Sequence, residues 1–142
     1  MLERTATVRW EGGLRDGRGH IRLGGGAWEG PYSFTSRFED GPGTNPEELL
    51  GAAHAGCFSM AFAKALADAG HPPRQIRTTA RVRLEQAAGG FAITRIGLRT
   101  EVEVPGLSDQ EFQRIAEAAK VGCPVSKALA STRIELEALR TG

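Results

Sequence analysis

Cysteine is scarce in this sequence, which has only Cys57 and Cys123 among its 142 residues. Two cysteines at this spacing fit none of the four-ligand zinc patterns, and we expect no metal and no bound cofactor. An apolar run is also missing from the N-terminal stretch MLERTATVRWEGG, so no secretory signal is predicted and we expect a cytoplasmic protein. In that reducing compartment, cysteines indicate thiol chemistry rather than a permanent disulfide.

The sequence also lacks an excess of charge of either sign. Its 18 Lys and Arg residues nearly balance 17 Asp and Glu residues, and the basic residues are dispersed along the chain. Binding to nucleic acid or to an anionic membrane requires a concentrated basic patch, so we expect neither partner. No glycine-rich loop of the kind that cradles phosphates follows a predicted strand, which excludes the common nucleotide-binding folds. The length predicts a single domain over residues 1–142.

The stretch from Asn45 to Gly70 has the pattern of one long helix. Asn45 can cap the helix N-terminus, Pro46 suits the first helical position, and Glu48 is placed to reach back to the amide of the cap. Gly70 can adopt the left-handed conformation that ends a helix, and two prolines follow it. Both ends of the predicted helix are therefore marked.

This helix is too apolar to lie on a surface. No charged residue occurs between Leu49 and Ala63, so we expect the helix to be enclosed on most sides. The charge-free run is shorter than the about 20 residues of a membrane span. Its glycines and alanines allow another backbone to approach closely, including the same helix of a second subunit. We therefore expect a buried core helix and a homodimer.

Strands are predicted where polar and apolar residues alternate. They cover residues 5–10, 20–23, 31–38, 79–85, 91–104 and 133–139. One face of strand 91–104 should be buried and carries Ile96, Leu98, Thr100, Val102 and Val104. A second helix begins at Ser108 with its own capping box and stops at Gly122, and a short third helix follows, with Pro124 at its first position. This order predicts an α+β fold in which antiparallel sheets pack around the long buried helix.

Cys57 and Cys123 are the candidate reactive residues. Burial in the helix would raise the pKa of Cys57 and leave it inert unless a cation stands beside it. Cys123 lies at a predicted helix start, where free amides and the helix dipole favour a thiolate. Composition is equally consistent with another interpretation, in which both cysteines act as small buried hydrophobic residues.

Arg37 and Glu47 are the candidate partners of Cys57. Arg37 opposes the apolar face of its predicted strand, although a solvated arginine would show the same pattern. At 100° per residue, Glu47 falls about 80° from Cys57 around the helix and about 15 Å from it along the axis. Glu47 can therefore act on the thiol only through Arg37 or from a second subunit, and it equally suits the helix N-terminus as an acidic residue. His54 shares this side of the helix, and we interpret it as a packed core residue.

A family resemblance is carried by four segments: FEDGPGTNPEELLGAAHAGCFSMA, GGFAITRI, VPGLS and KVGCPVSKAL. Together they resemble the osmotically inducible protein C (OsmC) family, relatives of the organic hydroperoxide resistance proteins, over nearly the whole chain. The resemblance implies a thiol peroxidase of stress defence that reduces organic hydroperoxides and forms an intertwined homodimer. It implies Cys57 as the peroxidatic cysteine, Cys123 as the resolving cysteine, Arg37 as the residue that holds the thiolate, and Glu47 as the partner of that arginine. It further suggests an external dithiol reductant of lipoyl type.

Other functions remain open from the residues themselves. A redox sensor or an apolar-ligand-binding protein would keep both cysteines without catalytic turnover. An acyl-thioester hydrolase would also suit a long apolar helix wrapped by a sheet, but it would need an Asp or Glu in the middle of the helix, where only His54 and Cys57 stand. The sequence therefore favours the peroxidase.

Overall fold

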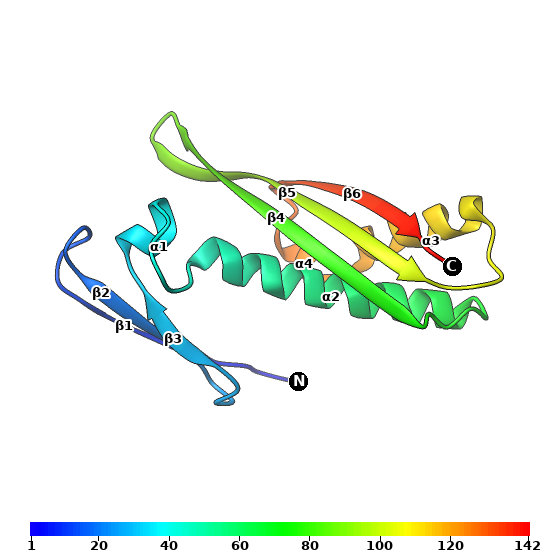
Figure 1. Cartoon of the computed structure of the whole chain (residues 1–142), viewed down its shortest axis with the longest axis horizontal. Coiled ribbons are helices and arrows are strands. Elements are labelled where there is room, and N and C mark those ends of the chain that lie inside the picture. Colours follow the sequence, from blue (N-terminus) through cyan, green and yellow to red (C-terminus); the bar gives the residue numbers. More distant parts are fainter. The chain divides into compact units, whose positions relative to one another are not determined.

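The computed structural model describes all residues from Met1 to Gly142. The chain comprises two compact units, Met1–Leu49 and Leu50–Gly142, and each has its own three-stranded sheet (Figure 1). The prediction of one domain stays a prediction. The predicted α+β class is confirmed, with the long helix α2, Pro46–Asp68, as the largest helical element.

The sheet of the first unit is antiparallel and follows the predicted hairpin. It contains β1 (Ala6–Glu11), β2 (Arg18–Leu23) and β3 (Glu29–Tyr32), in that order across the sheet. Gly19 lies between the rings of Trp10 and Tyr32, whose centroids are 5.3 Å apart. A Cβ atom at Gly19 would lie 2.2 Å from the Tyr32 ring and 2.7 Å from the Trp10 ring, so only glycine allows this aromatic pair to close over the strand.

The predicted strand over residues 31–38 is wrong beyond Tyr32. Residues Phe34–Phe38 form a short helix, α1, because Ser33 and Ser36 make a capping box. The Ser36 amide donates to Ser33 Oγ at 3.2 Å, and the Ser33 amide donates to Ser36 Oγ at 2.8 Å. These local hydrogen bonds compete with sheet pairing and override the alternating pattern. Arg37 consequently sits in the last turn of a helix.

The sheet of the second unit is mixed, which corrects the expectation of purely antiparallel pairing. Strands β4 (Gln75–Ala87) and β5 (Gly90–Glu103) form the predicted hairpin. The last strand, β6 (Arg133–Arg140), pairs parallel to β5. The chain between β5 and β6 contains α3 (Asp109–Gly122) and α4 (Pro124–Ala128), and such a helical crossover returns it to the end of the sheet where β5 began.

The helix starts are capped largely as predicted. Asn45 Oδ1 accepts from the Glu48 amide at 2.8 Å, and Gly70 has a φ of 89°, as expected at the end of α2. The Glu48 carboxylate does not reach back to the cap amide but accepts from Thr44 Oγ1 at 2.9 Å. The predicted capping box of α3 is also only half formed: Ser108 Oγ accepts from the Glu111 amide, whereas the Glu111 carboxylate binds Arg114.

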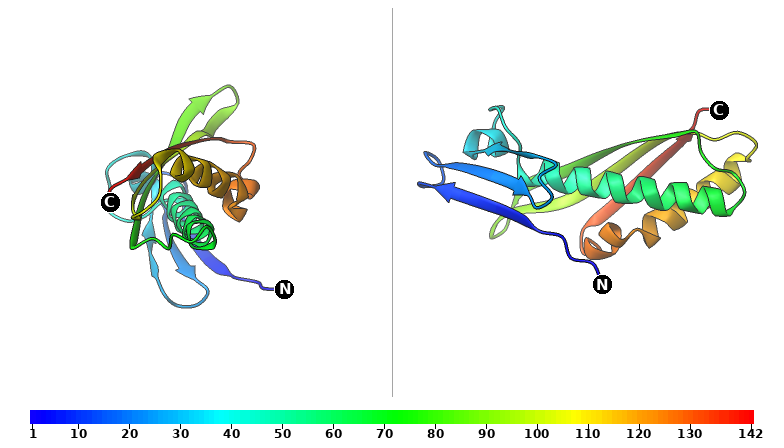
Figure 2. Two further views of the ribbon diagram at one scale, coloured as in Figure 1. Left: turned by 90° about the vertical axis from the view of Figure 1, so that its right-hand side faces the viewer. Right: turned by 90° about the horizontal axis from the view of Figure 1, so that it is seen from below.

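The core of the second unit lies between its sheet and its helices. Figure 2 shows α2 and α3 on the same side of the β4–β5–β6 sheet. The predicted inward face of β5 and its continuation is buried and consists of Ile96, Leu98, Thr100, Val102 and Val104. Phe62 of α2 lies between two other buried rings, with centroids 5.5 Å from Phe58 and 5.4 Å from Phe112.

One side of α2 is exposed in the single chain, contrary to the expectation that the helix is enclosed on most sides. This side carries Ala52, Ala53, Gly56 and Met60, and the Met60 side chain is among the most exposed apolar residues. By length and composition alone α2 is also apolar enough to cross a membrane, a test that core helices pass as well. The single chain therefore leaves an apolar helical face uncovered.

The aromatic cluster generates a prediction about stability. Replacing Phe62 with Ala should lower the free energy of unfolding by about 3–5 kcal/mol, because it removes a fully buried ring and leaves a cavity. Chemical denaturation followed by circular dichroism at one fixed protein concentration would measure the change. Val121→Ala, on the exposed side of α3, is the matched control and should change stability by less than about 0.5 kcal/mol. Equal losses in both variants would contradict this description of the core.

Candidate functional site

Arg37 and Glu47 form a two-pronged ion pair in the first unit. Arg37 Nε donates to Glu47 Oε1 at 3.0 Å, and Arg37 Nη2 donates to Glu47 Oε2 at 2.9 Å. The Glu47 side chain is only 10% exposed, whereas that of Arg37 is 35% exposed. A bidentate pair fixes the plane of the guanidinium, and the N–H groups that Glu47 does not use remain available to a third group.

Hydrogen bonds between α1 and the start of α2 hold this ion pair in place. Ser36 Oγ donates to the Thr44 carbonyl at 2.7 Å, and Asn45 Nδ2 donates to the Ser36 carbonyl at 3.0 Å. Gly43 between them has a φ of 110°, which lets the chain turn sharply. The segment that follows Arg37 is therefore tied to the helix that carries Glu47.

A small cavity of about 160 Å³ lies beside Arg37 in the same unit. Its lining is largely aromatic and consists of Trp10, Leu14, Tyr32, Ser33, Phe34, Arg37 and Phe38. The Arg37 guanidinium carbon lies 5.2 Å from the centroid of the Phe38 ring. The cavity thus combines apolar walls with a single cation, a lining that suits an apolar molecule with one polar end.

Cys57 and Cys123 lie together in the second unit. Cys57 is half-buried on α2, and Cys123 is fully buried at the N-cap of α4. Both are free thiols, and they lie close enough for each to shift the pKa of the other. The polar groups at the start of α4 act on their pKa values: the Val125 amide lowers that of both thiols, and the amide and hydroxyl of Ser126 lower that of Cys123.

The two thiols differ in the direction of their pKa shifts. Burial raises the pKa of Cys57, the Cys123 thiol raises it further, and the Val125 amide only partly opposes them. Burial also raises the pKa of Cys123, but the nearby Cys57 thiol and the polar groups of Ser126 and Val125 outweigh burial and leave the pKa below its ordinary value. Burial therefore disfavours the Cys57 thiolate, and Cys57 needs a cation beside it to ionise readily.

His54 has a polar partner that the sequence does not reveal. As predicted it is a fully buried residue, but its Nε2 atom lies 2.8 Å from Ser126 Oγ. Burial lowers the pKa of His54, so the ring is neutral near pH 7. A signal was present in the spacing, since His54 is three residues before Cys57 and Ser126 is three residues after Cys123. The pairing itself depends on tertiary structure.

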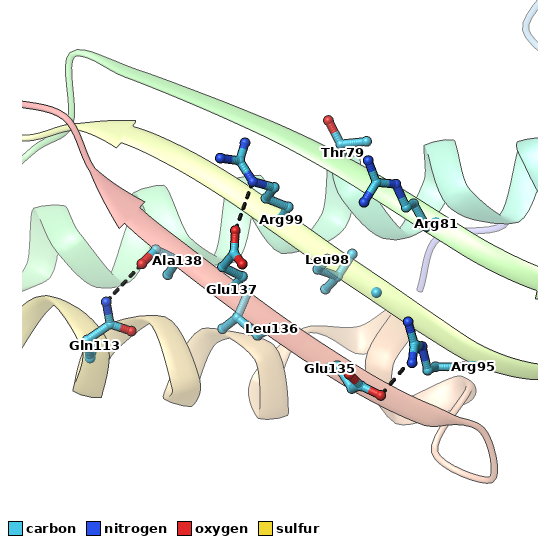
Figure 3. A pocket seen from close by; sticks show the side chains of 11 residues that line it. Thr79, Arg81, Arg95, Leu98, Arg99, Gln113, Glu135, Leu136, Glu137 and Ala138 are labelled. Atoms are coloured by element: carbon cyan, nitrogen blue, oxygen red, sulfur yellow. Dashed lines mark hydrogen bonds and ion pairs between the residues drawn. The ribbon is translucent and has the colours of Figure 1, made fainter.

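Another cavity, of about 530 Å³, lies against the β4–β5–β6 sheet and is lined by charged residues from all three strands (Figure 3). Its charged residues largely neutralise one another across the strands: Arg99 Nε donates to Glu137 Oε1 at 2.8 Å, and Arg95 Nε lies 3.5 Å from Glu135 Oε1. No cysteine or histidine lines it. The structure also contains no cluster of three or more His, Cys, Asp or Glu side chains that could hold a metal.

The four residues predicted from the sequence thus form two pairs. Arg37 and Glu47 meet in the unit Met1–Leu49, and Cys57 and Cys123 meet in the unit Leu50–Gly142. The first pair is an ion pair, and the second is a pair of neighbouring free thiols. The roles of these four residues stay predictions.

Comparison with known proteins identifies the family of this chain. The family model described as OsmC-like protein matches residues 39–137. Peroxiredoxin OsmC of Escherichia coli strain K12 is 47% identical over 129 residues, which cover 90% of each chain.

Two solved structures share the fold. An OsmC-like protein of unknown function from Vibrio cholerae superposes with a TM-score of 0.79 at 20% identity, covering 98% of this chain and 100% of that one. The organic hydroperoxide resistance protein OhrB of Bacillus subtilis superposes with a TM-score of 0.69 at 26% identity, covering 96% and 98%. With a family match over most of its length and a relative of this identity over nine-tenths of it, the chain belongs to the OsmC-like protein family.

Proposed function

We propose that this protein is a thiol-dependent peroxidase that reduces organic hydroperoxides to alcohols in stress defence. The observation that carries the proposal is the proximity of two reduced thiols, one half-buried and one fully buried, each of which shifts the pKa of the other. The relatives support it, because the Escherichia coli protein is named a peroxiredoxin and the Bacillus subtilis protein an organic hydroperoxide resistance protein. Cys57 is the peroxidatic cysteine and Cys123 the resolving cysteine.

The first step is attack by the Cys57 thiolate on the terminal oxygen of the hydroperoxide. A sulfur–oxygen bond forms, the oxygen–oxygen bond breaks, and the alkoxide that leaves takes a proton to become the alcohol. Arg37 supplies the positive charge that Cys57 lacks within its own unit, and the same guanidinium stabilises the departing alkoxide. Glu47 sets the orientation of Arg37 through the two hydrogen bonds between them.

The second step converts the Cys57 sulfenic acid to a disulfide with Cys123. The sulfur–sulfur bond forms, and the sulfenic oxygen leaves as water, which protects Cys57 from irreversible oxidation. An external dithiol, of lipoyl type in this proposal, then reduces the disulfide and is itself oxidised to a disulfide. This chemistry uses no metal and no prosthetic group.

The aromatic cavity beside Arg37 indicates the kind of hydroperoxide. Its apolar lining favours an alkyl or aryl group over the small polar hydrogen peroxide. The polar end of the substrate would meet the guanidinium, where the alkoxide forms in the first step. We therefore propose organic hydroperoxides as substrates in preference to hydrogen peroxide.

We further propose that the protein acts as a cytoplasmic homodimer. The exposed face of α2 carries Ala52, Ala53, Gly56 and Met60, and small residues of this kind let a second copy of the helix approach closely. Burial of this face against another subunit would remove an exposed apolar patch. In this arrangement Glu47 and Arg37 can act in the active site of their own chain or in that of the partner. The absence of nucleic-acid and membrane partners stays a prediction.

Substitution of the two cysteines separates catalysis from sensing. Cys57→Ser should abolish consumption of cumene hydroperoxide in the presence of excess dithiol. Cys123→Ser should allow about one turnover per subunit, after which Cys57 accumulates as sulfinic acid, because no resolving thiol is present. A coupled peroxidase assay and intact-protein mass spectrometry measure the two outcomes. Steady-state turnover in Cys57→Ser would contradict the proposal, and slow stoichiometric oxidation of the wild-type protein would indicate a redox sensor.

Substitution of the arginine tests the source of the charge. Arg37→Ala should raise the pKa of Cys57 by about one unit or more, a loss of at least about 1.4 kcal/mol of thiolate stabilisation. Because a positive charge lowers a thiol pKa, removing it should shift the alkylation rate of Cys57 to higher pH and slow the reaction at pH 7. The profile should be measured with Cys123→Ser present, so that one thiol reports. Arg99→Ala is the matched control, since Arg99 pairs with Glu137 on the sheet, and it should leave the profile in place. An unmoved profile in Arg37→Ala would assign the role to another cation.

A further inference from the structure

We propose that His54 is a positioning residue that acts through Ser126 on the sulfur of Cys123 and keeps this sulfur ready to attack the oxidised Cys57. The proposal rests on the peroxidase function above and deepens its second step. It gives a role to the buried polar pair of His54 and Ser126, which are not among the four predicted site residues. All of the groups involved lie in the unit Leu50–Gly142.

The three groups form a continuous chain of contacts. His54 projects from α2 and lies 2.8 Å from Ser126 Oγ of α4. Cys123 is the N-cap of this same short helix, and the Ser126 hydroxyl lowers its pKa. His54 and Cys123 are fully buried, and Ser126 is only 6% exposed. Such a network inside a core is costly unless its members satisfy one another, so its presence indicates a specific use.

The direction of the hydrogen bonds follows from the atom that has no partner. His54 Nδ1 is buried and makes no hydrogen bond. A proton on Nδ1 would leave a buried N–H donor unpaired, which native structures rarely tolerate. The ring proton therefore belongs on Nε2 and is donated to Ser126 Oγ. With its oxygen accepting from His54, Ser126 can turn its own proton towards Cys123, where it stabilises a negative sulfur.

Few other groups act on this sulfur. Besides the Ser126 hydroxyl, the groups that lower its pKa are the Cys57 thiol of α2 and the amides of Val125 and Ser126 in α4. The charged residue in the last turn of α3, Lys120, is paired with Glu117 at 2.8 Å. The other side chains in the core around Cys123 come from the sheet and the helices, and they are hydrophobic and uncharged. Since no formal charge supports Cys123, a hydroxyl donor held in a fixed orientation has a measurable effect on its ionisation.

The consequence concerns the rate of disulfide formation. When Cys123 attacks the Cys57 sulfenic acid, its sulfur must give up a proton, and that proton leaves with the sulfenic oxygen as water. The sulfur–sulfur bond forms as the sulfur–oxygen bond breaks, and the hydroperoxide of the first step is the only oxidant consumed. Loss of the donor from Ser126 keeps more of Cys123 protonated, so the sulfenic acid persists longer and is oxidised further.

A thiol titration tests the inference independently of peroxidase activity. In a Cys57→Ser background, where Cys123 is the sole thiol, thiolate absorbance or alkylation rate against pH reports the pKa of Cys123. His54→Asn and Ser126→Ala should each raise this pKa by about 0.5 to 1 unit. His54→Gln is the matched control, because its amide nitrogen occupies nearly the position of Nε2 and can still donate to Ser126. Its titration should stay close to that of the background protein.

The outcomes are distinct. Unchanged titrations in both His54→Asn and Ser126→Ala overturn the proposal, and so does a shift in His54→Gln as large as that in His54→Asn. Ser126→Ala removes a single oxygen atom and keeps the test decisive if changes at His54 disturb folding, which circular dichroism reports.

Kinetics with both cysteines present then connect the titration to the reaction. After one equivalent of cumene hydroperoxide, dimedone trapping of the sulfenic acid should increase severalfold in Ser126→Ala relative to wild type, while disulfide formation slows by a similar factor. An unchanged ratio of trapped sulfenic acid to disulfide overturns the link to resolution. If the wild-type protein forms neither species, the peroxidase function fails while the titration result stands.

Discussion

Placing negative charge on a sulfur atom inside an apolar core is the constraint around which this structure is arranged. Burial raises the pKa of both Cys57 and Cys123, so neither becomes a thiolate without compensation. The two thiols lie close enough to shift each other's pKa, so an anion on one of them raises the cost of forming an anion on the other. The groups supplied from the rest of the fold decide which sulfur is ionised at each stage.

The ion pair of Arg37 and Glu47 contributes orientation more than stability. A carboxylate that is only 10% exposed is costly without a partner, and two hydrogen bonds to a guanidinium largely offset that cost. Because Arg37 is 35% exposed, solvent screens the attraction and the net stabilisation is small. A rigid guanidinium with unused donors can then meet a charge that appears only during a reaction, without reorganising.

Much of the fold follows from local signals in the sequence. Asn45 and Gly70 mark the long helix, and the buried face of β5 follows from strict alternation. The errors arose where tertiary or competing local interactions decided the outcome. Ser33 and Ser36 turned a predicted strand into α1 by capping it, and the helical crossover made β6 parallel rather than antiparallel. The contact between His54 and Ser126 joins residues 72 positions apart, which no helical or strand periodicity predicts.

Accessibility and ionisation favour opposite assignments for the two cysteines, and accessibility decides. The donors in α4 make Cys123 the easier thiolate within its unit, which alone would favour it as the first to react. Cys123 is fully buried, however, and a hydroperoxide cannot reach it without opening the core, whereas Cys57 is partly exposed on α2. One neighbouring cation is enough to lower the pKa of Cys57 and reverse the order of ionisation. Opening a packed core to admit a substrate costs much more free energy. We therefore propose Cys57 as the residue that meets the substrate, and Cys123, which ionises more readily but is inaccessible, as the partner that needs to reach only Cys57.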